Sequence, residues 1–127
     1  MGMQQLLLIV VVVIITGLAI YVGVALVRTY SETSNRDQLV STLYDLGLMA
    51  QKYYKKPNEQ GGGAGTFTGW SMPGQFDKTD EGVFNAVVRS ERVDLSADGT
   101  QIGRNETTVV RVTARVDNDG IKITIVN

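Results

Sequence analysis

The chain begins with a long apolar segment. From Leu6 to Val27 it carries no charged residue, and Thr16 and Tyr21 are its only polar side chains. As an α-helix with a rise of about 1.5 Å per residue, this segment is roughly 33 Å long, which is close to the hydrocarbon thickness of a bilayer. A helix that is apolar on every side requires lipid or other apolar helices around it. We therefore expect residues 1–27 to form a transmembrane helix or the core of a filament.

The apolar pattern becomes one-sided after Val27. Apolar residues then recur at spacings of three and four, which is one stripe of a helix: Leu39, Leu43, Leu46, Ala50 and Tyr53. A second row lies beside this stripe: Val40, Tyr44 and Leu48. Lysines crowd the last turn, where cations favour a helix C-terminus, and Pro57 ends the helix. The sequence therefore predicts an amphipathic continuation over residues 28–56, and one helix of about fifty residues in all.

Residues 57–82 are rich in glycine and have no periodicity, which predicts a loop. The run Gly61–Gly65 lacks the Lys-Ser/Thr pair and the preceding strand of a phosphate-binding loop, so we expect a flexible surface loop. Four large apolar side chains lie in the same segment: Phe67, Trp70, Met72 and Phe76. We expect them to hold the loop against its own domain. The alternatives are an exposed adhesive patch and a contact with a neighbouring subunit.

Apolar and polar residues alternate from residue 83 onward, as is typical of strands. The segment GVFNAVVRSERV places alternate apolar side chains on one face: Phe84, Ala86 and Val88. Ala97–Gly99 has the composition of a turn, and we expect a short strand after it, near Thr100–Ile102. The segments TTVVRVTARV and IKITIV flank Asp117–Gly120, which predicts a β-hairpin.

These patterns together predict an α+β fold. An antiparallel sheet over residues 83–127, with one polar and one apolar face, needs a cover on the apolar face, and the helix stripe from Leu39 to Tyr53 has a suitable length. The sheet positions that we expect to face this stripe are Val110, Val112, Ile121, Ile123 and Ile125. The predicted architecture is a long N-terminal α-helix, apolar and then amphipathic, packed against a small C-terminal antiparallel β-sheet.

The composition limits the chemistry that is possible. The 127 residues include no Cys and no His, which excludes disulfides, thiolate nucleophiles and the commonest general base and metal ligand. Twelve basic and thirteen acidic side chains give a net charge of −1, and no basic run indicates nucleic-acid binding. Asp117, Asn118 and Asp119 lack the spacing of a calcium-binding loop, so we interpret them as turn residues. We expect no enzymatic activity, no catalytic residue, no cofactor and no metal.

Two segments resemble the type IV pilin superfamily, which includes pilus subunits, secretion-system pseudopilins and archaeal pilins with class III signal peptides. They are MQQLLLIVVVVIITGLAIYVGVALV, directly after Gly2, and RDQLVSTLYDLGLMAQKYYKKP. In this family a prepilin peptidase cleaves after a glycine that precedes the apolar run, so the resemblance implies cleavage between Gly2 and Met3. It also implies an extracellular filament at the cell surface, built by a pilus assembly machinery from subunits that are single-pass membrane proteins before assembly.

The resemblance and the apolar helix together predict a structural subunit that polymerises with copies of itself. The predicted polymerisation core consists of apolar side chains: Leu6, Leu7, Leu8, Ile9, Val12, Ile14, Ile15, Leu18, Ile20, Val22 and Leu26. Thr16, Gly17 and Gly23 are candidate packing points between helices, because small residues allow close approach. Two alternatives remain open: a minor pilin or secretion-system pseudopilin, and a monomeric, single-pass, membrane-tethered binding domain.

One modification motif is present. Asn105-Glu106-Thr107 matches the acceptor pattern for N-glycosylation. It lies in a predicted loop between two strands, where a modifying enzyme has access. Asn105 is therefore a candidate glycosylation site.

Overall fold

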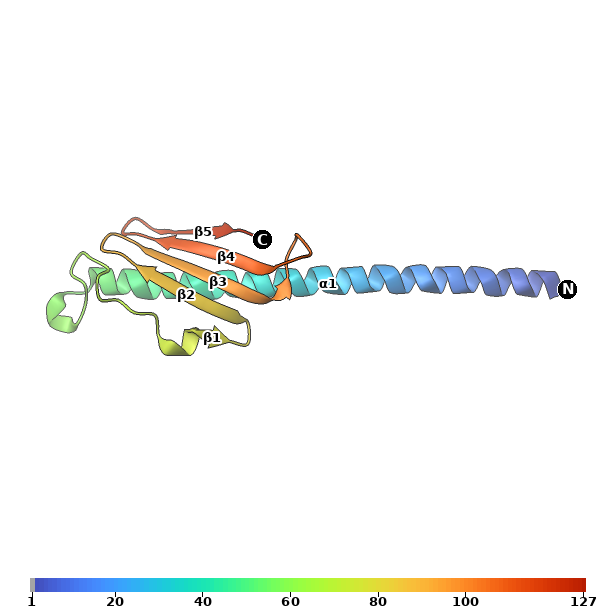
Figure 1. Ribbon diagram of the computed structural model, residues 1–127, viewed down its shortest axis with the longest axis horizontal. Helices are drawn as coiled ribbons and strands as arrows, with labels where there is room; N and C mark the ends of the chain where they lie inside the picture. The colour runs from blue at the N-terminus through green and yellow to red at the C-terminus, as the bar shows by residue number, and fades with distance from the viewer. Residues whose placement is uncertain (1) are drawn as a thin grey trace. The chain divides into compact units, whose positions relative to one another are not determined.

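A computed structural model describes residues 2–127 and has an α+β fold (Figure 1). One helix, α1 (Gly2–Lys55), is followed by a five-stranded antiparallel sheet. The predicted long N-terminal helix is confirmed. The residues before Glu32 and the residues from Glu32 to Asn127 form two separate compact units. The second unit, which we call the head, contains the sheet and the part of α1 against which the sheet packs.

The five strands follow one another across the sheet in chain order, each antiparallel to its neighbour. They are β1 (Lys78–Thr79), β2 (Gly82–Val88), β3 (Val93–Ile102), β4 (Val109–Val116) and β5 (Ile121–Ile125). Two short 3₁₀ helices precede β1: η1 (Asn58–Gln60) and η2 (Gly74–Phe76). This meander leaves β1 and β5 at the two edges of the sheet.

The core of the head lies between one face of the sheet and α1. The helix contributes the predicted stripe. Four of its members are fully buried, Leu39, Leu43, Leu46 and Ala50, and the fifth, Tyr53, is partly buried against the core. The strands contribute the apolar positions of the alternating pattern: Phe84, Val93, Leu95, Ala97, Val110, Val112, Ala114 and Val116. The predicted core positions Val110 and Val112 are confirmed, because both are completely inaccessible to solvent.

The edge strand β5 is covered less completely than the sequence predicts. Ile121 and Ile123 pack against the core and are partly buried. The prediction is wrong for Ile125, which is 46% exposed, because a side chain on an edge strand has a neighbouring strand on one side only. The helix approaches the start of β5 closely, since a Cβ on Gly47 would lie 2.7 Å from Cδ1 of Ile121.

The strand boundaries around β3 differ from the predicted ones. The segment GVFNAVVRSERV contains all of β2, a turn, and the first residue of β3. In the turn, the amide of Arg89 donates to the carbonyl oxygen of Arg92. The turn predicted at Ala97–Gly99 is wrong, since β3 continues through these residues. Gly99 allows the side chain of Asn35 to pack closely against β3, because a Cβ at this position would lie 2.1 Å from Oδ1 of Asn35.

The side chain of Asn35 is buried and joins α1 to the sheet. Its Nδ2 donates to the carbonyl oxygen of Glu81 at 2.8 Å. Its Oδ1 accepts from the amides of Thr100 and Gln101 at 3.1 and 3.4 Å. Because β3 shifts register against β4 in this region, Asn35 satisfies backbone groups that lack regular strand partners.

The glycine-rich segment caps the C-terminus of α1. The amides of Gly63 and Gly65 donate to the carbonyl oxygens of Tyr53 and Tyr54, each at 2.8 Å. The last carbonyls of a helix have no partner within it and need such donors. The expectation of a flexible surface loop is therefore wrong at Gly62 and Gly63, both of which are buried.

The apolar side chains of the same segment hold it to the head. Phe67 and Trp70 are buried, and Met72 and Phe76 are partly buried against the core. The ring of Phe67 packs on the ring of Tyr54, with 4.7 Å between the centroids. The prediction that these residues attach the loop to its own domain is confirmed.

Candidate assembly surface

The apolar part of α1 leaves its side chains exposed. All of the predicted polymerisation residues have exposed fractions between 52% and 67%: Leu6, Leu7, Leu8, Ile9, Val12, Ile14, Ile15, Leu18, Ile20, Val22 and Leu26. Among residues 2–127, α1 is the one helix that is long and apolar enough to cross a membrane. An uninterrupted apolar surface of this size requires an apolar partner.

The polar and small residues within this surface do not interrupt it. The hydroxyl of Thr16 donates to the carbonyl oxygen of Val12 at 2.8 Å, so this donor is satisfied inside the helix. At Gly17 and Gly23, nothing lies within 4 Å of the place that a Cβ would occupy. The two glycines therefore form notches in which a second helix has room to approach. The packing role of these three residues stays a prediction.

A second exposed apolar row lies on the head's part of α1. Tyr44, Leu48 and Met49 are 49%, 45% and 40% exposed, because the sheet covers only the neighbouring stripe. Leu48 also lines a shallow hollow of about 470 Å³ whose other walls include Lys52 and Lys55. This surface combines exposed apolar area with positive charge.

The candidate processing positions are accessible. Gly2 and Met3 lie in the first turn of α1. Asn105 is exposed between β3 and β4, and its Oδ1 accepts from the amides of Thr107 and Thr108 at 3.0 Å each. The Asn105 side chain thus closes its own turn at the surface. Leader cleavage and glycosylation stay predictions.

The carboxylates of the last hairpin have a structural role. Oδ1 of Asp117 accepts from the amides of Asp119 and Gly120 at 3.0 and 2.9 Å, as is usual for Asp in a turn. The interpretation of these residues as turn residues is confirmed. Within residues 2–127 there is no group of three or more Asp or Glu placed to hold a metal ion.

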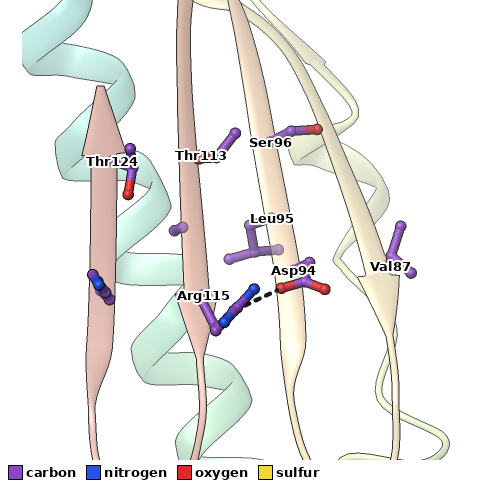
Figure 2. A pocket seen from close by; sticks show the side chains of 9 residues that line it. Val87, Asp94, Leu95, Ser96, Thr113, Arg115 and Thr124 are labelled. Carbon is purple, nitrogen blue, oxygen red and sulfur yellow. Dashed lines mark ion pairs between the residues drawn. The ribbon is translucent and has the colours of Figure 1, made fainter. Parts of the chain in front are cut away.

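The outer face of the sheet is polar and is crossed by ion pairs. Asp98 on β3 pairs with Arg111 on β4, with 2.6 Å between Oδ1 and Nε. This hydrogen bond first, and the charge of Asp98 second, raise the pKa of Arg111 above its usual value. Asp94 on β3 pairs with Arg115 on β4, with 3.5 Å between Oδ1 and Nε, as Figure 2 shows.

A hollow of about 500 Å³ lies on this outer face. Its lining includes the ion pair of Asp94 and Arg115, the side chain of Lys122 and three hydroxyl groups: Ser96, Thr113 and Thr124. These residues are far apart in sequence and were not predicted to lie together. The signal was present as alternate polar positions on three strands, but strand register is needed to bring them together.

No protein-family model matches this chain, and no curated protein and no solved structure matches it. We therefore base the proposed function on the two surfaces described above, the apolar part of α1 and the exposed row at Tyr44, Leu48 and Met49.

Proposed function

We propose that this protein is a structural subunit of an extracellular helical filament of the type IV pilus kind, and that it polymerises through residues 6–27 of α1. One observation carries the proposal. A helical surface of 22 consecutive uncharged residues is exposed in the folded chain, so the chain alone does not provide the apolar surroundings that this surface needs.

Association of this surface with copies of itself has a large driving force in water. Burial among identical helices removes roughly 2,000 Å² of apolar surface per subunit from water, and at about 25 cal/mol per Å² this corresponds to tens of kcal/mol before the entropic cost of association. In a bilayer the gain is small, because lipid already solvates the helix. We therefore expect membrane-resident subunits, a machinery that extracts them, and a polymer that dissociates very slowly in water.

A helical polymer also needs contacts that repeat without closing into a ring. The exposed row at Tyr44, Leu48 and Met49 supports the proposal, because these apolar side chains lie outside the core of the head and are available for contact with another subunit. Aromatic residues and Met are enriched in protein interfaces. In the proposed filament this row contacts a different surface of the next subunit.

A membrane-tethered binding domain is the second candidate function. The hollow on the outer face of the sheet favours it, because a tethered receptor needs a recognition site on its head. In this case a single α1 lies in the bilayer, surrounded by lipid, and the protein does not polymerise. The two candidates differ in the surroundings of residues 6–27.

The proposal predicts that surface filaments can be sheared from cells that express the chain. Mass spectrometry of the sheared and sedimented material should identify peptides of the head, such as the one containing Trp70, and electron microscopy should show thin filaments. Cells that lack the gene serve as the control. Recovery of the chain exclusively from the membrane fraction, with no filaments in the sheared fraction, would contradict the proposal and support the tethered domain.

A further inference from the structure

The outer face of the sheet is organised in rows that cross the strands. The pairing register aligns Asp94, Arg115 and Lys122 on adjacent strands. Two residues away on each strand, the register aligns three hydroxyl side chains: Ser96, Thr113 and Thr124. Neighbouring strands are about 4.8 Å apart and successive rows on one face are about 7 Å apart. A charged row therefore lies beside a hydroxyl row, and both line the hollow (Figure 2).

The charged row has more cations than its carboxylate can neutralise. Asp94 lies within ion-pair distance of three guanidinium groups: Arg89 at 3.9 Å, Arg92 at 3.4 Å and Arg115 at 3.5 Å. Lys122, next to Arg115 in the register, has no carboxylate within 4 Å among residues 2–127. Three guanidinium groups thus share one carboxylate, and Lys122 adds a fourth cation to the same row, in a chain whose net charge is −1.

The acidic residues of the adjoining turns do not neutralise this cluster. Glu91 and Asp119 form no ion pair with these cations within residues 2–127, and Asp117 accepts hydrogen bonds from the backbone of its own turn. Among the residues that line the hollow, the two cations Arg115 and Lys122 exceed the one carboxylate, Asp94. An anionic group on a ligand complements this excess, with Arg115 and Lys122 as the contacting cations.

We propose that this hollow binds an acidic polysaccharide, a hydroxyl-rich chain that carries carboxylate groups. Its carboxylates would be bound by Arg115 and Lys122, and its hydroxyls would exchange hydrogen bonds with Ser96, Thr113 and Thr124. The carboxylate of Asp94 fits the same ligand, because sugar hydroxyls are donors and Asp is an acceptor. All of these side chains come from one sheet, so a single chain contains the whole site.

Other anionic partners fit the face less well. Single-stranded nucleic acid binds through aromatic side chains on which bases stack, and the outward positions of β2 to β5 carry none: Val83, Asn85, Val87, Asp94, Ser96, Asp98, Arg111, Thr113, Arg115, Lys122 and Thr124. A protein partner usually supplies a central apolar patch, whereas six of the nine residues that line this hollow are polar and, of the three apolar ones, Leu95 and Ala114 are buried.

The test measures the binding of end-labelled oligogalacturonate to the full chain in neutral detergent micelles, by fluorescence anisotropy at low salt. We expect saturable binding that neutral dextran does not compete for. The double substitution Arg115→Gln, Lys122→Gln should weaken binding about tenfold, because it removes both contacting cations. Fluorescence of Trp70, which is buried in the head, reports whether the variant is folded.

The matched control is Lys55→Gln, Lys56→Gln, which removes the same charge from exposed positions near the C-terminus of α1. Its affinity should change by less than about twofold. Three results would each overturn the proposal: no binding by the unsubstituted chain, equal weakening by the two double variants, or binding of oligodeoxythymidylate at least as tight as that of oligogalacturonate. The last result would indicate a nucleic-acid surface instead.

Discussion

Replacement of Ile15 by Asp is expected to abolish filament formation. Ile15 lies in the middle of the exposed apolar surface and is 59% exposed. An Asp at the centre of an apolar helix costs about 2.5–3.5 kcal/mol in insertion experiments. In a filament every subunit repeats this cost, and each buried carboxylate also lacks a partner. The amount of sheared filament relative to membrane-bound subunit should therefore fall below detection by electron microscopy and immunoblotting.

The matched control for this variant is Gln38→Asp. It adds the same charge at an exposed position of α1 within the head, so we expect filaments in normal amounts. The ratio of filament to membrane-bound subunit separates a defect in polymerisation from a defect in membrane insertion. Normal filaments from the Ile15→Asp variant would show that residues 6–27 do not form the core of the polymer.

Replacement of Leu43 by Ala is expected to lower the free energy of unfolding of the head by about 2–5 kcal/mol. Leu43 is completely inaccessible to solvent and belongs to the core between α1 and the sheet. The substitution removes apolar contacts and leaves a cavity. Because Trp70 is the only tryptophan and is buried, its fluorescence during urea unfolding of the full chain in micelles measures this loss.

The control for the core is the neighbouring substitution Tyr44→Ala. Tyr44 is half exposed, so the head should lose less than about 1 kcal/mol. In the proposed filament, however, this variant removes a contact between subunits and should reduce the yield of filaments. A similar loss of stability in the two variants would contradict the assignment of Leu43 to the core and of Tyr44 to the outside.

The periodicity of apolar residues predicted the buried face of the helix and the core positions of the sheet. The spacing from Leu39 to Ala50 identified the buried face of the helix, and alternation identified Val110 and Val112 as core positions. Both periodicities follow from backbone geometry, so they hold wherever one face is buried. Ile125 fits the same alternation and is nonetheless half exposed, because its position at the edge of the sheet depends on strand order.

The errors involve glycine and buried polar residues, whose roles depend on distant partners. Gly99 looks like a turn residue in sequence, but the side chain of Asn35 occupies the space that a Cβ at this position would need. Arg36 is 5% exposed; its ion pair with Glu32 follows from their helical spacing, whereas its hydrogen bond to the carbonyl oxygen of Asn127 does not. Neither Asn35 nor Arg36 carries a local signal that it is buried.

The candidate sites were predictable to different extents. The apolar surface of α1 is a continuous run, and its exposure follows from its length and uniformity. The hollow on the outer face is assembled from β3, β4 and β5, and the residues that give its charge are separated along the chain. Arg92 is only two residues from Asp94 in sequence, whereas Arg115 reaches Asp94 only because β3 and β4 pair in one register. A shift by one residue would move Arg115 to the opposite face.

The central claim is that residues 6–27 pack against the same residues of other subunits. Cross-linking between the apolar helices of different subunits tests it directly. The chain contains no Cys, so the substitutions Leu8→Cys, Leu18→Cys and Leu26→Cys in one chain provide the only thiols. A flexible bis-maleimide added to sheared filaments should produce a ladder of covalent oligomers, and the Cys-free chain should remain monomeric. A Cys-substituted chain that stays monomeric with linkers of several lengths would contradict the account.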